Sequence, residues 1–294
     1  MIRLANAPTS WGVEKEIETD RPPWSVFLDE VAESGYDGVE LGPYGYLPTD
    51  AAVLAEELAA RSLTLVAGYV MGPLHTEAGR VAALREARDV LRLVSAVGGA
   101  YLVVIPGVIT GSGPRTTNGP RSMDDDGLLA VARTIRCIAE EAGSVGVRVA
   151  FHPHAGSGIE TGVDADRLLA EVDRDALGLV LDTGHSFYAG DDPATRIREL
   201  GSRIVYVHLK DVTPAVLLRA TEGGWEFWKA YRAGVFCPLG AGGVDFAAVR
   251  GALDSVGYSG WLTVEQDADP QGTGRPFEDA VHSRKFLQDI GLGR

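Results

Sequence analysis

The sequence predicts a single parallel (β/α)₈ barrel that occupies residues 1–294 as one domain. Eight short apolar segments alternate with amphipathic helical segments along the chain, the order that is typical of a closed parallel sheet. The last four apolar segments each end in metal-capable side chains, and parallel barrels carry their chemistry at the carboxyl ends of their strands. The length of 294 residues also suits an undivided barrel.

The first half of the chain contains four predicted strands and three predicted helices. Pro22 and Pro23 precede the first helix and Gly35 follows it, as expected for helix boundaries. Asp50 can cap the second helix, and a glycine pair ends the third. The predicted strands are 2–7, 36–41, 62–69 and 101–105, and the predicted helices are 24–34, 50–61 and 81–97.

The second half continues the same alternation. Its apolar runs are short and uninterrupted, which favours strands that are buried on both faces. The predicted strands are 147–152, 177–182, 204–208 and 261–265, and the predicted helices are 124–143, 164–172, 193–200, 245–256 and 276–289.

Two long loops follow the fourth and the seventh predicted strand. The loop 107–123 is rich in Gly, Pro, Ser and Thr, and loops of this length in compact domains are usually functional or disordered. We expect it to form a lid or pocket wall that contains Arg115 and Asn118. The insertion 212–243 is dense in aromatic residues, which indicates either a cover that excludes water or a surface that packs on another subunit.

Composition excludes several classes of partner. The formal net charge of -14 repels a nucleic-acid backbone and gives no attraction to anionic lipid. No apolar run approaches the roughly 20 residues that span a bilayer, and the N-terminus lacks a secretory signal, so a cytoplasmic location is expected. Cys137 and Cys237 are too far apart to suggest a disulfide framework, and both are expected to be reduced. No Gly-x-Gly-x-x-Gly follows the first strand, so a dinucleotide site has no support.

Asp182, His208 and Glu265 end three successive predicted strands, and a barrel would bring them together. Carboxylate and imidazole ligands without thiolate suit Mn²⁺, Co²⁺, Fe²⁺ or Zn²⁺. His152, His154 and His185 follow or end neighbouring strands. The alternative is that each side chain only hydrogen-bonds a loop, but a chance arrangement becomes less plausible as more of them fall in register.

Trp11 and Glu40 have two interpretations each. Trp11 follows the first strand, where a tryptophan either packs in the core or forms the wall of a ligand pocket. Glu40 lies near the end of the second strand, as either a buried substrate contact or a solvated side chain.

Three of these motifs carry a family resemblance that covers nearly the whole chain. Asp-Thr-Gly-His at 182–185, His-Leu-Lys-Asp at 208–211 and Glu265 resemble the sugar isomerase/epimerase superfamily with a xylose-isomerase-like barrel. Within it, the segments 7–12, 151–161 and 181–190 are similar to the inosose dehydratases of myo-inositol catabolism.

The resemblance implies one divalent metal, with Mn²⁺ or Co²⁺ favoured over Mg²⁺ or Zn²⁺, held by Asp182, His208 and Glu265. Many members of the superfamily add a glutamate at the end of the fifth strand, where this chain has His152. The fourth ligand is therefore His152, His154 or Glu160. The substitution also removes one of the paired carboxylates that epimerases of this type use as acid and base.

The implied reaction is the dehydration of a cyclic polyol ketone such as 2-keto-myo-inositol, without a redox cofactor. Candidates for the acid and the base are His152, His154 and Glu160, with Glu265 also at the reacting centre. His185 is expected to bind substrate or to support the metal ligands. Lys210 is expected to stabilise developing negative charge or to pair with a nearby aspartate, Asp211 or Asp182. The alternatives are a ketose isomerase or epimerase and a noncatalytic sugar-binding barrel. Oligomerisation is left open.

Overall fold

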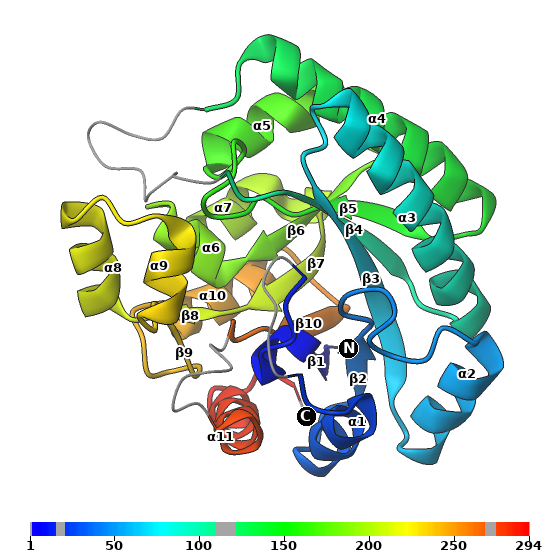
Figure 1. The fold of residues 1–294 in the computed structure, drawn as a ribbon. Coiled ribbons are helices and arrows are strands. Elements are labelled where there is room, and N and C mark those ends of the chain that lie inside the picture. Colours follow the sequence, from blue (N-terminus) through cyan, green and yellow to red (C-terminus); the bar gives the residue numbers. More distant parts are fainter. Residues whose placement is uncertain (1, 16–20, 110–121, 268–274, 294) are drawn as a thin grey trace.

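The computed structural model describes residues 2–15, 21–109, 122–267 and 275–293. Within this part of the chain, eight parallel strands close into a barrel in the order β1-β10-β7-β6-β5-β4-β3-β2, and the predicted (β/α)₈ fold is confirmed. Helices surround the barrel on the outside (Figure 1). The strands are β1 (Arg3–Asn6), β2 (Gly38–Glu40), β3 (Thr64–Gly72), β4 (Tyr101–Pro106), β5 (Arg148–Phe151), β6 (Gly178–Asp182), β7 (Ile204–Leu209) and β10 (Trp261–Val264).

Most helices begin at the polar caps that the sequence contains. Asp50 accepts backbone N–H bonds at the start of α2, as predicted. Thr76 caps α3 in the same way, so this helix begins four residues before the predicted start. The helices are α1 (Trp24–Glu33), α2 (Ala51–Ala60), α3 (Glu77–Val97), α4 (Asp125–Ser144), α5 (Gly162–Glu171), α6 (Thr183–Tyr188), α7 (Pro193–Leu200), α8 (Pro214–Glu222), α9 (Phe227–Arg232), α10 (Phe246–Ser255) and α11 (Pro276–Asp289), with 3₁₀ turns at Pro8–Trp11 and Gly201–Arg203.

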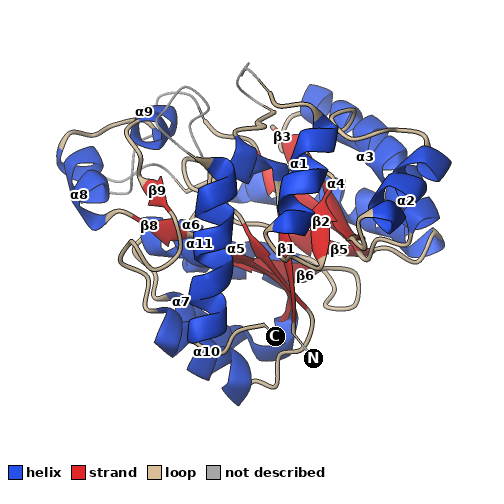
Figure 2. Cartoon of the chain, turned by 90° about the horizontal axis from the view of Figure 1, so that it is seen from below, coloured by secondary structure: helices blue, strands red, loops and turns tan. Residues whose placement is uncertain are grey.

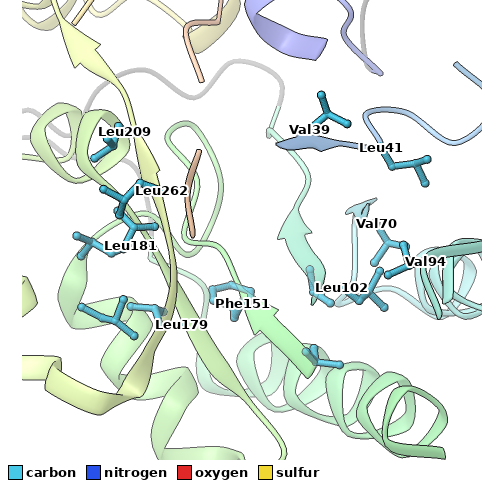
Figure 3. Close-up of a cluster of buried hydrophobic side chains, with 14 of the residues drawn as sticks. Val39, Leu41, Val70, Val94, Leu102, Phe151, Leu179, Leu181, Leu209 and Leu262 are labelled. Atoms are coloured by element: carbon cyan, nitrogen blue, oxygen red, sulfur yellow. The ribbon is translucent and has the colours of Figure 1, made fainter. Parts of the chain in front are cut away.

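The core has two layers, because alternate residues of each strand point to opposite faces of the sheet. Leu179, Leu181 and their counterparts on the other strands pack outward against the helices, as Figure 3 shows. Val180 belongs to a second cluster inside the barrel. The same alternation places Asp182 on the inner side, directly beyond Val180.

A separate layer covers one end of the barrel and is built from the insertion after β7. It contains α8, α9 and the antiparallel pair β8 (Asp211–Val212) and β9 (Phe236–Cys237). Its apolar side chains form their own buried cluster around Phe227 and Phe236. Figure 2 shows this layer at the end of the barrel that lies away from the two chain termini. The insertion, called the cover below, is therefore a folded layer with its own apolar core.

Asp211 fastens this cover to the barrel. Its carboxylate accepts backbone N–H bonds from Gly240 and Gly242 at 2.9 Å and from Val244 at 3.0 Å. Bonds to an ionised, buried carboxylate are among the stronger hydrogen bonds in proteins. Asp211 is thus a structural anchor. It does not pair with Lys210, although the sequence suggested Asp211 as one of two possible aspartate partners for that lysine.

Two further expectations from the sequence concern the loop after β4 and the lack of a membrane-spanning segment. The segment 110–121, with Arg115 and Asn118, lies outside the described residues, so its predicted role as a lid is not tested. Among the helices that the structure describes, none combines the length and the apolar character needed to cross a bilayer.

Candidate functional site

Four potential metal ligands meet at the carboxyl ends of the barrel strands. His152 follows β5, Asp182 ends β6, His208 lies in β7 and Glu265 follows β10. One ligand atom from each lies within 4.8 Å of the others. Residues that are between 26 and 113 positions apart in the sequence are thus brought together, because neighbouring parallel strands end at the same rim.

The two oxygens of Asp182 have different tasks. Oδ1 accepts the backbone N–H of His185 at 2.8 Å and so caps α6. Oδ2 has no hydrogen-bond partner among the described residues, yet it lies 3.5 Å from His152 Nε2 and 3.8 Å from His208 Nδ1. A buried carboxylate oxygen without a donor is costly unless a cation neutralises it.

His208 is oriented by carboxylates on both sides. Its Nε2 lies 2.8 Å from Glu40 Oε1, and its Nδ1 lies 3.1 Å from Glu265 Oε2. The hydroxyl of Tyr206 donates to the same Glu40 oxygen at 2.5 Å. A histidine that donates one ring N–H to a carboxylate presents the lone pair of the other nitrogen, which is the usual arrangement for a metal ligand.

The donor set fits a divalent cation. Two imidazoles and two carboxylates converge, one carboxylate oxygen lacks a donor, and no cysteine of the described chain takes part. Such mixed nitrogen and oxygen ligation suits first-row transition metals better than Ca²⁺ or a structural zinc site. Of the three candidates for the fourth ligand, His152 is the one in this cluster.

Lys210 is completely buried beside the cluster. Its Nζ lies 2.6 Å from Asp267 Oδ1, 3.1 Å from Glu265 Oε2 and 3.8 Å from Asp182 Oδ2. Burial alone would lower the pKa of this ammonium, but the charges of Asp267, Glu265 and Asp182 raise it above its ordinary value. Lys210 is therefore a fixed cation, and in return it helps to hold the pKa of Glu265 well below the usual range.

Gly184 is required beneath Lys210. A Cβ atom at this position would lie 2.5 Å from Lys210 Cγ, far inside van der Waals contact. The short helix α6 passes so close to β7 that only glycine fits. The Asp-Thr-Gly-His motif thus supplies a candidate metal ligand, a helix cap and space for the buried lysine.

His154 lies in the pocket with one ring nitrogen free to react. Its Nδ1 is 2.8 Å from the carbonyl oxygen of Ala155, which can only accept, so the proton sits on Nδ1 and Nε2 keeps its lone pair. The ring packs between His185 and Phe227, with centroids 4.1 and 5.2 Å away. Burial and the neighbouring His152 and Lys210 lower the pKa of His154 to about 3.

A pocket of about 560 Å³, counted with its open mouth, leads to the metal ligands. Polar groups line its base and aromatic rings of α9 line its upper wall. Its lining residues are Thr9, Glu14, Glu40, Tyr69, Met71, Val103, Ile105, His152, His154, His208, Lys210, Phe227, Trp228, Tyr231, Glu265 and Asp267.

Two residues expected at the site lie elsewhere, and a third, His185, adjoins the candidate ligands without lining the pocket. Trp11 is in the core, where its ring packs on Phe27 and its N–H donates to Glu30, so the core interpretation holds. Glu160 faces a neighbouring cavity and accepts the backbone N–H of Gly156 at 2.8 Å. The backbone N–H of His185 donates to Asp182 Oδ1 at 2.8 Å, its Nδ1 accepts the backbone N–H of Ala155 at 3.1 Å, and its Nε2 lies 3.2 Å from Lys210 Nζ.

Sequence reasoning missed several residues of the pocket. Asp267 is one of them, although its position two residues after Glu265 gives both side chains the same direction along an extended segment. Glu14 and Tyr231 had no such signal, because they come from a loop after β1 and from the cover and meet only in the folded chain.

Comparison with known proteins relates the chain to one family. The model of the family described as xylose isomerase-like TIM barrel matches residues 28–290. Rhizopine catabolism protein MocC of Rhizobium meliloti is 34% identical over 273 residues, which cover 92% of this chain and 82% of MocC. Inosose dehydratase of Geobacillus thermodenitrificans is 30% identical over 296 residues, which cover 98% of this chain and 97% of the relative.

Solved structures confirm the architecture. The IOLI protein, whose crystal structure contains a bound zinc atom, superimposes with a TM-score of 0.77 over 98% of this chain and 97% of IOLI. The two sequences are 18% identical, so the comparison bears on the fold.

Proposed function

We infer that the chain, which belongs to the xylose isomerase-like TIM barrel family, is a metal-dependent hydro-lyase that dehydrates a cyclic polyol ketone. Its substrate class follows from the relatives named inosose dehydratase, which match it over nearly their whole length. We take 2-keto-myo-inositol as the compound to test first.

The observation that carries the proposal is the convergence of His152, Asp182, His208 and Glu265, of which His152, His208 and Glu265 line the pocket. These four residues would hold a divalent cation, for which Mn²⁺ or Co²⁺ is our first choice. When bound, the cation supplies a Lewis acid for the carbonyl oxygen of the ketone. The remaining chemistry falls to side chains of the pocket.

His154 is the base that the geometry favours among the residues considered. Its Nε2 carries the lone pair, and the residue lines the pocket beside the metal ligands. His152 is directed at Asp182, and Glu160 faces the neighbouring cavity. Removal of the proton next to the ketone by His154 generates the enolate, which then expels the hydroxyl on the next carbon.

Lys210 and Glu40 form or break no covalent bond in this reaction. They hold other side chains of the site in place. Lys210 neutralises the carboxylates of Glu265 and Asp267, and Glu40 fixes the orientation of His208. Such supporting contacts keep ligands in productive geometry. The aromatic wall formed by Phe227, Trp228 and Tyr231 limits the access of water to the reacting carbons.

The test is to strip the protein with chelator, to restore Mn²⁺, Co²⁺, Mg²⁺ or Zn²⁺ separately, and to analyse the product from 2-keto-myo-inositol by mass spectrometry. We expect metal-dependent formation of a product that is lighter by one water. A product of unchanged mass that contains solvent deuterium would instead identify an isomerase or epimerase. Turnover that is indifferent to chelation, or sugar binding without turnover in any metal, would contradict the proposal.

A further inference from the structure

A further acidic side chain enters the pocket from the loop that follows the first strand. Glu14 lines the pocket together with His154, Glu265 and Asp267, although it belongs to no strand end. Its Oε1 accepts a hydrogen bond of 3.4 Å from the hydroxyl of Tyr231 on α9. The N-terminal loop and the cover therefore meet at this carboxyl group.

The loop is held firmly at the next residue. Lys15 Nζ forms an ion pair of 2.6 Å with Glu86 of α3 and donates to the carbonyl oxygen of Met71 at 3.0 Å. On the other side, Gly12 ends the 3₁₀ turn in the left-handed conformation, with φ 70°. Because both flanks are fixed, the position of Glu14 in the pocket is defined by the fold and not by a free loop.

The other carboxylates of the pocket lie against basic side chains. Asp267 and Glu265 pair with Lys210, and Glu40 accepts from Tyr206 and lies against His208. Glu14 has no cation within ion-pair distance among the described residues and receives only a neutral hydroxyl. Burial, together with the charges of Asp267 and Glu265, raises the pKa of Glu14 well above its ordinary value.

We propose that Glu14 is the acid that protonates the departing hydroxyl in the dehydration, with Tyr231 orienting its carboxyl group. The role rests on the proposed function, because it presupposes a substrate that loses water. It also supplies the second acid–base group that the reaction needs once His154 acts as the base. Both residues line the pocket: His154 follows β5 and packs on Phe227 of the cover, and Glu14 comes from the loop after β1 and contacts Tyr231 of the cover.

The step balances without an oxidant or a further reactant. His154 accepts the proton from the carbon next to the ketone, and the electron pair of that C–H bond becomes the new carbon–carbon double bond. The carbon–oxygen bond to the neighbouring hydroxyl breaks with its electron pair, and Glu14 gives its proton to that oxygen, which leaves as water. Glu14 then regains a proton from solvent, and His154 releases one.

The experiment separates removal of the proton from loss of water. Glu14→Gln is loaded with Mn²⁺ and incubated with 2-keto-myo-inositol in D₂O, while NMR follows deuterium exchange next to the ketone and mass spectrometry follows dehydration. We expect dehydration to fall at least about 100-fold, the usual contribution of a positioned acid, while exchange continues within about threefold of wild-type turnover. The dissociation constant for Mn²⁺ should stay within about twofold, since Glu14 is not among the ligands.

Three further variants complete the test. Glu14→Asp keeps a carboxyl group and should retain part of the dehydration. Tyr231→Phe should lower dehydration less than Glu14→Gln and also spare exchange, which gives a second measurement if Glu14→Gln does not fold. Glu226→Gln, on the exposed start of α9, is the matched control and should behave as wild type.

Dehydration at the wild-type rate in Glu14→Gln would overturn the role of Glu14, as would equal loss of exchange and dehydration. A wild-type protein that neither exchanges nor dehydrates would refute the proposed function itself, and the role of Glu14 with it. The two failures are therefore distinguishable.

Discussion

Asp182 and His208 face each other in register on β6 and β7, with Asp182 Oδ2 3.8 Å from His208 Nδ1. The other Asp182 oxygen caps α6. One oxygen of Asp182 thus caps a helix, and the other faces the candidate metal centre. A substitution that keeps the first oxygen and removes the charge should therefore change metal binding more than stability.

Asp182→Asn should remove the metal while the fold remains. An asparagine oxygen can still accept the N–H of His185, so the cap of α6 is preserved. We expect affinity for Mn²⁺ to fall by more than about 100-fold, because loss of a supporting partner alone typically costs about 10–100-fold. Calorimetric titration measures the affinity, and thermal unfolding of the metal-free protein serves as the control. Unchanged affinity would refute Asp182 as a ligand.

Glu40→Gln tests the orientation of His208. The amide keeps the size of the side chain but loses the charge that favours the Nε2–H form of the ring. We expect metal affinity to decrease about 10–100-fold, less than for Asp182→Asn. Electron paramagnetic resonance of bound Mn²⁺ can follow this decrease in affinity. An effect on substrate affinity with metal binding intact would instead favour the direct substrate contact considered from the sequence.

Lys210→Met should destabilise the fold strongly. The change leaves Asp267 and Glu265 buried without their cation, and breaking such a pair by removing one partner typically costs about 3–5 kcal/mol. Urea unfolding of the metal-free protein measures the change in the free energy of unfolding. The double variant Lys210→Met with Asp267→Asn should recover part of the loss, and a purely additive result would show that the two residues do not interact.

Gly184→Ala should act through the same lysine. The added methyl group would meet Lys210 Cγ at 2.5 Å, and overpacking of this kind costs about 1–3 kcal/mol. Gly143→Ala in α4 is the matched control, since nothing lies within 4 Å of its Cβ position. For Gly143→Ala we expect the free energy of unfolding to rise by up to about 1 kcal/mol, because alanine has the higher helix propensity. Equal effects at both sites would contradict the close approach of α6 to β7.

Cys237 should be slow to alkylate. Burial raises the pKa of its thiol to about 11, so the reactive thiolate becomes abundant only as the pH rises toward 11. In a Cys137→Ser background at pH 8, we expect iodoacetamide to react roughly 100-fold more slowly than with the same protein in urea, where a thiol pKa near about 8.5 is restored. Equal rates in the folded and unfolded protein would show that the thiol is not shielded.

Much of the fold was predictable because it follows from local patterns. Apolar runs of strand length, the cap at Asp50 and the prolines before α1 gave the order of elements and most of their boundaries. The helix α6 was missed, since its six residues contain no apolar periodicity and the Asp182 cap was interpreted only as a ligand. The early start of α3 at Glu77 depends on Thr76, a cap that precedes the apolar pattern by a full turn.

The sequence by itself determined the barrel and the three candidate ligands at strand ends, because strand periodicity and parallel topology direct such residues to one rim. The tertiary structure decided the rest. It placed His152 in the candidate metal cluster and left His154 and Glu160 outside it, packed Trp11 in the core, and brought Glu14 and Tyr231 together across 217 positions. Contacts between a loop and an insertion follow no periodicity, so only the packed chain reveals them.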